Sequence, residues 1–308
     1  MLRFSSGDRV CFVGDSITAQ NRYLALLVDY YKTNFPNEDI KIFNCGISGA
    51  SCPVTLKYFE EDVASHAPTH IFIMIGVNDS SRWDLDKPRS PERDEILLTA
   101  YENYKKNLAA LYEKSVALGA KVTLITPPPY DEHRNTPQPA FKGGYELMTG
   151  YANYVKEYAE ANGFECLDLF SYFVDKMKTE VLYNDDHTHP NDLGHYHLAK
   201  CILQNQGLEI GEFRPFPEYL EKWRNFVLLY RDIYATEHMM IKNDELTTEQ
   251  KVAMMQRYVD NKEYYVEGRR ESLNDFNERL SKGYVQNKPR QAEMFKAIDL
   301  LYDNLKAK

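Results

Sequence analysis

A serine stands directly after the first apolar run of the chain. Residues 10–13 are apolar and lead into Gly14, Asp15 and Ser16, and an apolar-periodic helical stretch begins a few residues later. This pattern predicts a buried strand with Ser16 at its carboxyl end, the edge at which open parallel sheets bind ligands. A serine at that edge is a candidate nucleophile for acyl transfer. The alternative is that Ser16 only caps the following helix, because serine is a preferred N-cap residue.

A general base for this serine is predicted in the loop of residues 184–191. Asp186 and His189 are three residues apart and can form a hydrogen bond when the loop curls back, with His189 facing the end of the first strand. Pro190 fixes the backbone immediately after the histidine. Asp185 is the alternative orienting acid, although its spacing to His189 is one residue longer.

Two further strand ends supply hydrogen-bond donors for a developing oxyanion. Gly49 offers an unobstructed backbone N–H, Asn78 offers a side-chain amide, and Ser16 has its own N–H. Loss of one such donor typically costs about 3 kcal/mol of transition-state stabilisation. The alternatives are that Gly46 and Gly49 are turn glycines and that Asn78 forms an Asx turn.

The histidines of the carboxyl-terminal part raise the question of a metal site. His187, His195 and His197 lie close to His189 in the sequence. His195 and His197 are two residues apart on a predicted helix, so they do not share a face and cannot both bind one ion. We therefore expect no metal and no cofactor, and keep metal-dependent hydrolysis as an alternative that predicts activity lost to chelators.

The elements that must position these residues alternate between apolar runs and amphipathic stretches. Strands are predicted at residues 10–13, 40–44, 70–75, 121–126 and 165–169, and helices at 23–34, 53–65, 94–118, 145–161, 170–178 and from about 191 to 205. This alternation predicts a three-layer α/β fold with a doubly wound, five-stranded parallel sheet and right-handed crossovers. The polar stretches 80–91 and 130–144 are predicted to be surface loops that shape the pocket above Ser16.

The last third of the chain has a different character. After residue 217 no strand-like run remains, and helices are predicted at 217–240, 248–281 and 289–306. We expect a catalytic domain over residues 1–205 and an all-helical extension over 206–308. The extension is predicted either to wall one side of the cleft or to form a homodimer contact.

Composition limits the classes of partner. The net charge is −9, with 20 Lys and Arg against 28 Asp and Glu up to residue 205 and 17 against 18 after it. No basic stripe is present for nucleic-acid binding, and no apolar run is long enough to cross a membrane. The five cysteines show no Cys-x-x-Cys spacing and are expected to be reduced thiols. The amino-terminal residues lack the apolar core of a signal peptide, so cytoplasmic residence is expected.

Four blocks of the sequence resemble those of the SGNH or GDSL hydrolase family. They are Gly14-Asp15-Ser16-Ile17, Asn44-Cys45-Gly46-Ile47-Ser48-Gly49, Gly76-Val77-Asn78-Asp79 and Asp186-His187-Thr188-His189-Pro190. The resemblance implies a flavodoxin-like SGNH fold in which Ser16 is the nucleophile, His189 the base and Asp186 its orienting acid. It also implies an oxyanion hole of Ser16, Gly49 and Asn78, with Asp15 in a structural role.

These residues together predict a serine esterase that forms an acyl-enzyme. The substrate is expected to be a small-molecule ester, most readily a short acyl group on a carbohydrate, because aromatic residues such as Trp83 and Tyr130 lie near the loops. Lipase or lysophospholipase and acyl-thioesterase activities of the same family remain alternatives. A non-catalytic flavodoxin-like module that grips an anion with the Ser16 and Gly49 loops is a further alternative.

Overall fold

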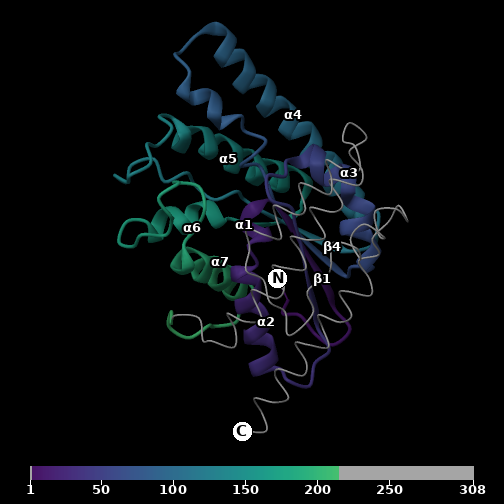
Figure 1. Cartoon of the computed structure of the whole chain (residues 1–308). Helices are drawn as coiled ribbons and strands as arrows, with labels where there is room; N and C mark the ends of the chain where they lie inside the picture. Colours follow the sequence, from purple (N-terminus) through teal and green to yellow (C-terminus); the bar gives the residue numbers. More distant parts are fainter. Residues whose placement is uncertain (1, 215–308) are drawn as a thin grey trace, which may run out of the picture. The chain divides into compact units, whose positions relative to one another are not determined.

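The computed structural model describes residues 2–214, which contain all the predicted strands and every predicted site residue. The predicted helices at 217–240, 248–281 and 289–306, and with them the homodimer contact, lie outside the described residues. Figure 1 shows the chain.

Five parallel strands form one sheet. They are β1 (Arg9–Gly14), β2 (Lys41–Gly46), β3 (His70–Met74), β4 (Lys121–Ile125) and β5 (Glu165–Leu167), and their order across the sheet is β2-β1-β3-β4-β5. This is the flavodoxin-like order, in which β2 lies on one side of β1 and β3, β4 and β5 follow on the other side. The predicted fold class is confirmed, with strand ends that differ by two residues or fewer.

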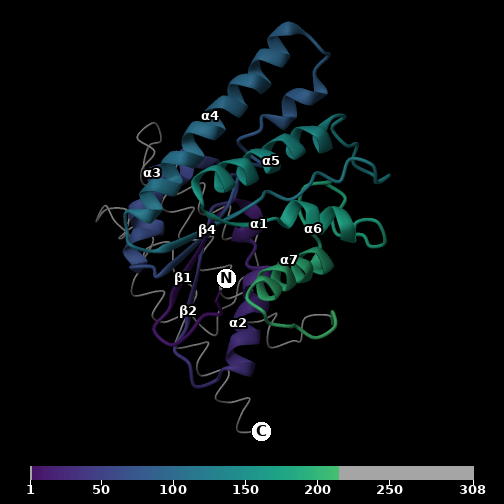
Figure 2. The same ribbon diagram turned by 180° about the vertical axis from the view of Figure 1, so that it is seen from behind.

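Helices cover both faces of this sheet, as Figures 1 and 2 show. The helix α2 (Arg22–Asn34) packs with α7 (Asp192–Asn205), whereas α3 (Cys52–Asp62), α4 (Pro91–Val116) and α5 (Gly144–Asn162) follow one another on the other side. The helix α6 (Leu169–Lys176) packs beside α7. None of the helices within residues 2–214 combines the length and apolar character that crossing a membrane requires.

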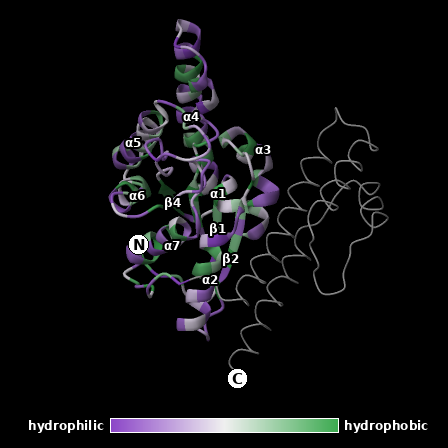
Figure 3. Ribbon diagram, turned by 60° about the vertical axis from the view of Figure 1, so that its left-hand side comes forward, coloured by the Kyte–Doolittle hydropathy of each residue, from purple (hydrophilic) through white to green (hydrophobic). Residues whose placement is uncertain are grey.

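The core lies on both faces of the central strands. In β3 the side chains of residues 71–73 are at most 1% exposed, as expected for a parallel strand with helices on each side. Phe12 of β1 and Phe72 of β3 are register partners and stack with ring centroids 4.7 Å apart. Figure 3 shows the apolar strands at the centre and hydrophilic residues along the outer helices.

The structure corrects several element boundaries. The helix α4 begins at Pro91, not at residue 94, because Ser90 accepts a hydrogen bond from the Arg93 N–H and a proline at the first helical position loses no bond. The stretch 80–91 contains a 3-10 helix, η2 (Arg82–Asp86), and the stretch 52–66 is split into α3 and a 3-10 turn, η1 (Ala64–His66). A one-turn helix, α1 (Ser16–Ala19), was not predicted at all.

Two predictions about side chains have mixed outcomes. The loop of residues 130–144 is not purely a surface loop, because Tyr130 is 4% exposed and Asp131 is 7% exposed. The five cysteines are free thiols, as predicted; four are buried and Cys166 is half-buried.

Candidate active site

Three neighbouring strands deliver the predicted residues to one edge of the sheet. Ser16 follows β1, Gly49 follows β2 and Asn78 follows β3, and β1 lies between the other two. Because parallel strands end at the same edge, the three loops lie side by side there.

Ser16 is the first residue of α1, and its hydroxyl contacts an imidazole. Ser16 Oγ lies 2.7 Å from His189 Nε2. The N-cap of α1 is Asp15, whose carboxylate accepts a hydrogen bond of 2.9 Å from the Ile17 N–H. Burial raises the pKa of Asp15 to about 6, although this hydrogen bond acts to lower it. The capping role considered for Ser16 therefore belongs to Asp15.

The carboxylate of Asp186 holds the other nitrogen of that imidazole. His189 Nδ1 lies 2.6 Å from Asp186 Oδ2, and the backbone N–H groups of Thr188 and His189 donate to Asp186 Oδ1 at 3.0 and 2.9 Å. Partial burial acts to raise the pKa of Asp186, but these hydrogen bonds outweigh it and lower the pKa below its usual value. Asp185 does not contact the ring and pairs instead with Arg134, at 3.3 Å.

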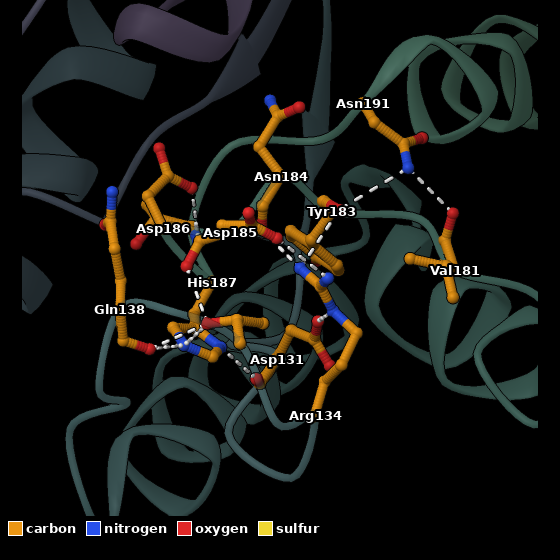
Figure 4. Close-up of polar contacts among 12 residues, drawn as sticks. Asp131, Arg134, Gln138, Val181, Tyr183, Asn184, Asp185, Asp186, His187 and Asn191 are labelled. Carbon is orange, nitrogen blue, oxygen red and sulfur yellow. Dashed lines mark hydrogen bonds and ion pairs between the residues drawn. The ribbon is translucent and has the colours of Figure 1, made fainter.

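The loop that carries Asp186 and His189 is fastened to the loop after β4 (Figure 4). The guanidinium of Arg134 bonds Asp131 at 2.6 Å and the backbone oxygen of Tyr183 at 3.1 Å, and it also bonds the backbone oxygen of Asn184. The buried ring of His187 lies between the two loops, with Nδ1 2.8 Å from the backbone oxygen of Asp131.

Two contacts fix the far end of the same loop. Asn191 caps α7 by accepting from the Gly194 N–H at 3.0 Å, and its amide donates to the backbone oxygen of Val181 at 2.8 Å. An isolated antiparallel bridge pairs Tyr183 with Pro190 and closes the loop at its base. The residues between them, including Asp186 and His189, are thus held in a closed turn.

Both ends of the Asn78 amide are fixed. Nδ2 donates to the backbone oxygen of Ala50 at 3.0 Å, and Oδ1 accepts from Arg82 Nη1 at 3.4 Å rather than forming an Asx turn. An amide nitrogen carries two hydrogens, so one N–H is left over after the bond to Ala50. Since Ala50 is next to Gly49, the bond also holds the Gly49 loop beside Asn78.

Asp79 adds a second tie between these two loops. Its carboxylate accepts from the Cys52 N–H at 2.9 Å. Burial raises the pKa of Asp79 to about 6, and burial together with the charge of Asp79 raises the pKa of the Cys52 thiol. The Gly49 loop and the Asn78 loop are therefore joined by the amide of Asn78 and by the carboxyl group of Asp79.

The two glycines after and within β2 have different functions in the fold. Gly49 has a φ of +77°, which glycine adopts without strain, and its N–H has no hydrogen-bond partner within residues 2–214. Gly46 lies in β2 rather than in a turn, where a Cβ would lie 2.4 Å from the backbone nitrogen of Ala19. Gly46 thus lets α1 approach the sheet closely, and Gly49 leaves a donor open.

The histidines considered as a metal cluster contact separate groups. His195 bonds Gln20 at 3.2 Å, and His197 lies between Glu180 and Tyr172, at 2.5 and 3.1 Å. Within the described part of the chain no group of three or more His, Cys, Asp or Glu side chains is arranged to hold a metal ion.

Sequence reasoning missed Arg82, Asp79 and Arg134. Asp79 is the last residue of the block Gly76-Val77-Asn78-Asp79. Arg82 and Arg134 lie inside the predicted loops 80–91 and 130–144, which are rich in charged residues. The sequence shows only that each arginine lies in a loop after a strand, and this does not reveal that its side chain makes a buried contact. Arg82 is 7% exposed in the structure.

This arrangement is suited to acyl transfer. A serine hydroxyl in contact with an imidazole, which is itself held by a carboxylate, can lose its proton as it attacks a carbonyl carbon. The N–H of Ser16 has no intrahelical partner because it is the first residue of α1, so it can donate to an oxyanion.

Comparison with known proteins gives consistent matches. An acetylxylan esterase of Geobacillus stearothermophilus is 29% identical over 227 residues, which cover 68% of this chain and 98% of that protein. The crystal structure of Axe2, an acetylxylan esterase from the same organism, superposes with a TM-score of 0.56 at 28% identity, covering 69% of this chain and all of that one. Variants of Axe2 with a serine, an aspartate or a histidine replaced by alanine are described as catalytic mutants.

Another solved structure, described as a gut microbial diltiazem-metabolizing enzyme, matches with a TM-score of 0.61 and 29% identity. That match covers 67% of this chain and 48% of the other, so this chain spans about half of it. Residues 12–196 match the family model for the GDSL-like lipases and acylhydrolases, in agreement with the four sequence blocks. Because this match spans more than half of the chain, the protein belongs to the GDSL-like lipase/acylhydrolase family and is a carboxylic ester hydrolase.

Proposed function

We propose that this protein removes short acyl groups, above all acetyl, from carbohydrate hydroxyls by way of an acyl-enzyme on Ser16. The observation that carries the proposal is the chain of two short contacts from Ser16 Oγ through the His189 ring to Asp186, of 2.7 and 2.6 Å. This geometry favours proton removal from the hydroxyl over simple anion binding, which needs no imidazole behind the serine.

In the proposed reaction Ser16 Oγ attacks the ester carbonyl while His189 takes its proton. The N–H groups of Ser16 and Gly49 and the free N–H of Asn78 donate to the oxyanion of the tetrahedral intermediate. His189 then gives the proton to the leaving alkoxide, and Asp186 stabilises the transient imidazolium. Water, activated by His189, attacks the acyl-serine and releases the carboxylic acid.

The carbohydrate part of the proposal is supported by the relatives. Both the similar protein of Geobacillus stearothermophilus and the superposable Axe2 structure are acetylxylan esterases, and Axe2 is also described as an acetyl-xylooligosaccharide esterase. The acidic balance of residues 1–205 disfavours strongly anionic substrates, and a neutral acetylated sugar meets no such barrier.

A substrate panel tests the proposal. Acetylated xylo-oligosaccharides and acetylated monosaccharides are compared with octanoyl and palmitoyl esters and with an acyl-thioester, and kcat/KM is expected to be highest for the acetylated sugars. A preference for the long acyl chains or for the thioester would overturn the substrate class.

Ser16→Ala is expected to lose at least about 1,000-fold in kcat and all labelling by a fluorophosphonate. Full activity of Ser16→Ala would overturn the mechanism.

A further inference from the structure

Trp83 is a large, exposed aromatic side chain that contacts Arg82, a neighbour of the candidate active-site residue Asn78. Its exposed fraction is 53%. Phe213, at 37%, is the other exposed Phe, Trp or Tyr ring among the exposed large hydrophobic side chains of the described residues, and its ring packs against Tyr196 with centroids 5.5 Å apart. A single exposed apolar side chain is ordinary on a protein surface, so only the position in which the indole is held can point to a ligand.

Trp83 is tied to the oxyanion residue Asn78 through Arg82. The Arg82 guanidinium lies over the indole ring, 4.1 Å from its centroid, and its Nη1 donates to the backbone oxygen of Val77 at 2.7 Å and to Asn78 Oδ1 at 3.4 Å. Ser81, with a φ of +50°, turns the chain sharply before η2. Arg82 thus links the indole of Trp83 to Asn78, a proposed oxyanion donor.

Arg82 itself is almost fully buried. It is 7% exposed, and its Nε is buried without a hydrogen-bond partner within the described residues. Burial lowers the pKa of the guanidinium, while the charges of Asp15 and Asp186 act to raise it. The cation covers one face of the indole and fixes it, as cation–π pairs do, and leaves the rest of the ring to solvent.

The surroundings of the indole favour a sugar over an acyl chain. η2 carries Asp84 and Asp86 next to Trp83, and Lys87 pairs with Asp84. A fatty acyl chain needs an apolar enclosure, which a half-exposed ring does not give, whereas a pyranose ring offers C–H groups to an aromatic face.

We propose that Trp83 is the stacking platform for a pyranose ring of the alcohol part of the substrate, and that Arg82 fixes the platform relative to Asn78. This inference rests on the proposed function and adds the residue that selects for a sugar. Trp83 is therefore a specificity-determining residue, and it takes no part in proton transfer.

The test compares two substrates in Trp83→Ala and Trp83→Phe. For an acetylated xylo-oligosaccharide relative to p-nitrophenyl acetate, the ratio of kcat/KM is expected to fall about tenfold in Trp83→Ala, through KM rather than kcat, which corresponds to about 1.4 kcal/mol. Trp83→Phe keeps an aromatic face and is expected to retain most of the ratio. Leu98→Ala, which removes a side chain 60% exposed on α4, is the matched control and should leave the ratio as in the parent.

A binding measurement separates this inference from the proposed function. Unacetylated xylo-oligosaccharide is added as a competitor of p-nitrophenyl acetate hydrolysis, and it is expected to inhibit the parent several-fold more strongly than Trp83→Ala. If the parent does not deacetylate sugars but this difference is seen, the proposed function fails and the platform stands. If Trp83→Ala deacetylates sugars with the parent's ratio, or binds the competitor equally well, the platform is overturned and the proposed function stands.

Discussion

Asp15 is a carboxyl group whose burial disfavours its charged form. It is 2% exposed, caps α1 and has its pKa raised to about 6 by burial. In the unfolded chain the group titrates near 3.8, so the folded state binds its proton more tightly. The folded state is therefore favoured when Asp15 is protonated, and that advantage is lost as the pH rises from about 4 through 6.

Asp15→Asn keeps the shape and the helix cap but cannot ionise. Between pH 4.5 and 7.5 the free energy of unfolding of this variant, relative to the parent, is expected to rise by about 1–3 kcal/mol, as a pKa shift of about two units implies. Urea denaturation at the two pH values measures it. Asp15→Ala also removes the ionisable group but loses the cap, so it should be about 1 kcal/mol less stable than Asp15→Asn at both pH values. A difference between Asp15→Asn and the parent that does not change with pH would contradict the expectation.

Asp186 and Asp185 are adjacent carboxylates with different partners, and this gives a matched pair of variants. Asp186→Asn replaces the acceptor for His189 Nδ1 and is expected to lower kcat by about 10³–10⁴-fold, because the ring loses its orienting charge. Asp185→Asn weakens only the contact with Arg134 and should cost less than about tenfold. Steady-state kinetics with p-nitrophenyl acetate decides it, and comparable losses in the two variants would reject this division of roles.

At the residue scale, the side chains proposed to react could be predicted from the sequence, whereas the side chains that hold them in place could not. Ser16, Asp186 and His189 are recognisable because acyl transfer needs those residue types at strand ends, and the structure brings them together. Their catalytic roles remain predictions. Arg82 contacts Val77 and Asn78 in its own loop, whereas Arg134 contacts the backbone oxygen of Tyr183, 49 residues later in the chain. Residue type and spacing specify neither set of partners.

Among the elements, the loop of residues 183–191 is held by contacts from a neighbouring loop. Arg134 joins it to the loop after β4, and that bond network includes Asp131, whose side chain is 10% exposed. Position errors of an ångström in such a loop can cost large factors in rate.

Arg134→Met keeps the bulk of the side chain and removes its hydrogen bonds. We expect kcat to fall about tenfold or more with a smaller change in KM, fluorophosphonate labelling to slow in parallel, and stability to fall by about 1–3 kcal/mol. Arg89→Met, in which an exposed arginine paired with Asp94 is changed, is the control. If kcat falls no further in Arg134→Met than in Arg89→Met at equal folded fraction, the loop does not depend on Arg134.

Element types could be predicted where the periodicity is long, whereas element boundaries depend on short local signals. The 26-residue α4 was evident, yet its start was placed three residues late although Ser90 and Pro91 form a clear start signal. The four residues of α1 are too few to show any helical period. Its position depends on Gly46, which admits it against β2, and that is a contact between distant segments.

For the whole molecule, the sheet extends from Arg9 to Leu167 and the family match covers residues 12–196, while the chain continues for more than a hundred residues beyond the match. The alternation of strands and helices predicted the doubly wound parallel sheet, because right-handed crossovers leave few arrangements, whereas the flavodoxin-like arrangement was implied by the family resemblance. The predicted catalytic residues Ser16, Asp186 and His189 all lie within that match.

A chain that ends after residue 214 tests the predicted role of the extension. If the extension walls the cleft or forms a dimer contact, the shortened protein is expected to change either in substrate preference across the ester panel or in mass by light scattering. Retention of solubility, oligomeric state and substrate preference together would contradict both forms of the prediction. The full-length protein measured at the same concentration is the reference.

The hydrogen bond between Ser16 and His189 joins residues 173 positions apart in the chain. Contacts of such separation form only after the intervening chain has been organised, because the loop they close is long. During refolding the helices can return while the serine still lacks its base. Recovery of esterase activity is therefore a late reporter of folding, and it should lag behind recovery of the far-ultraviolet circular dichroism signal.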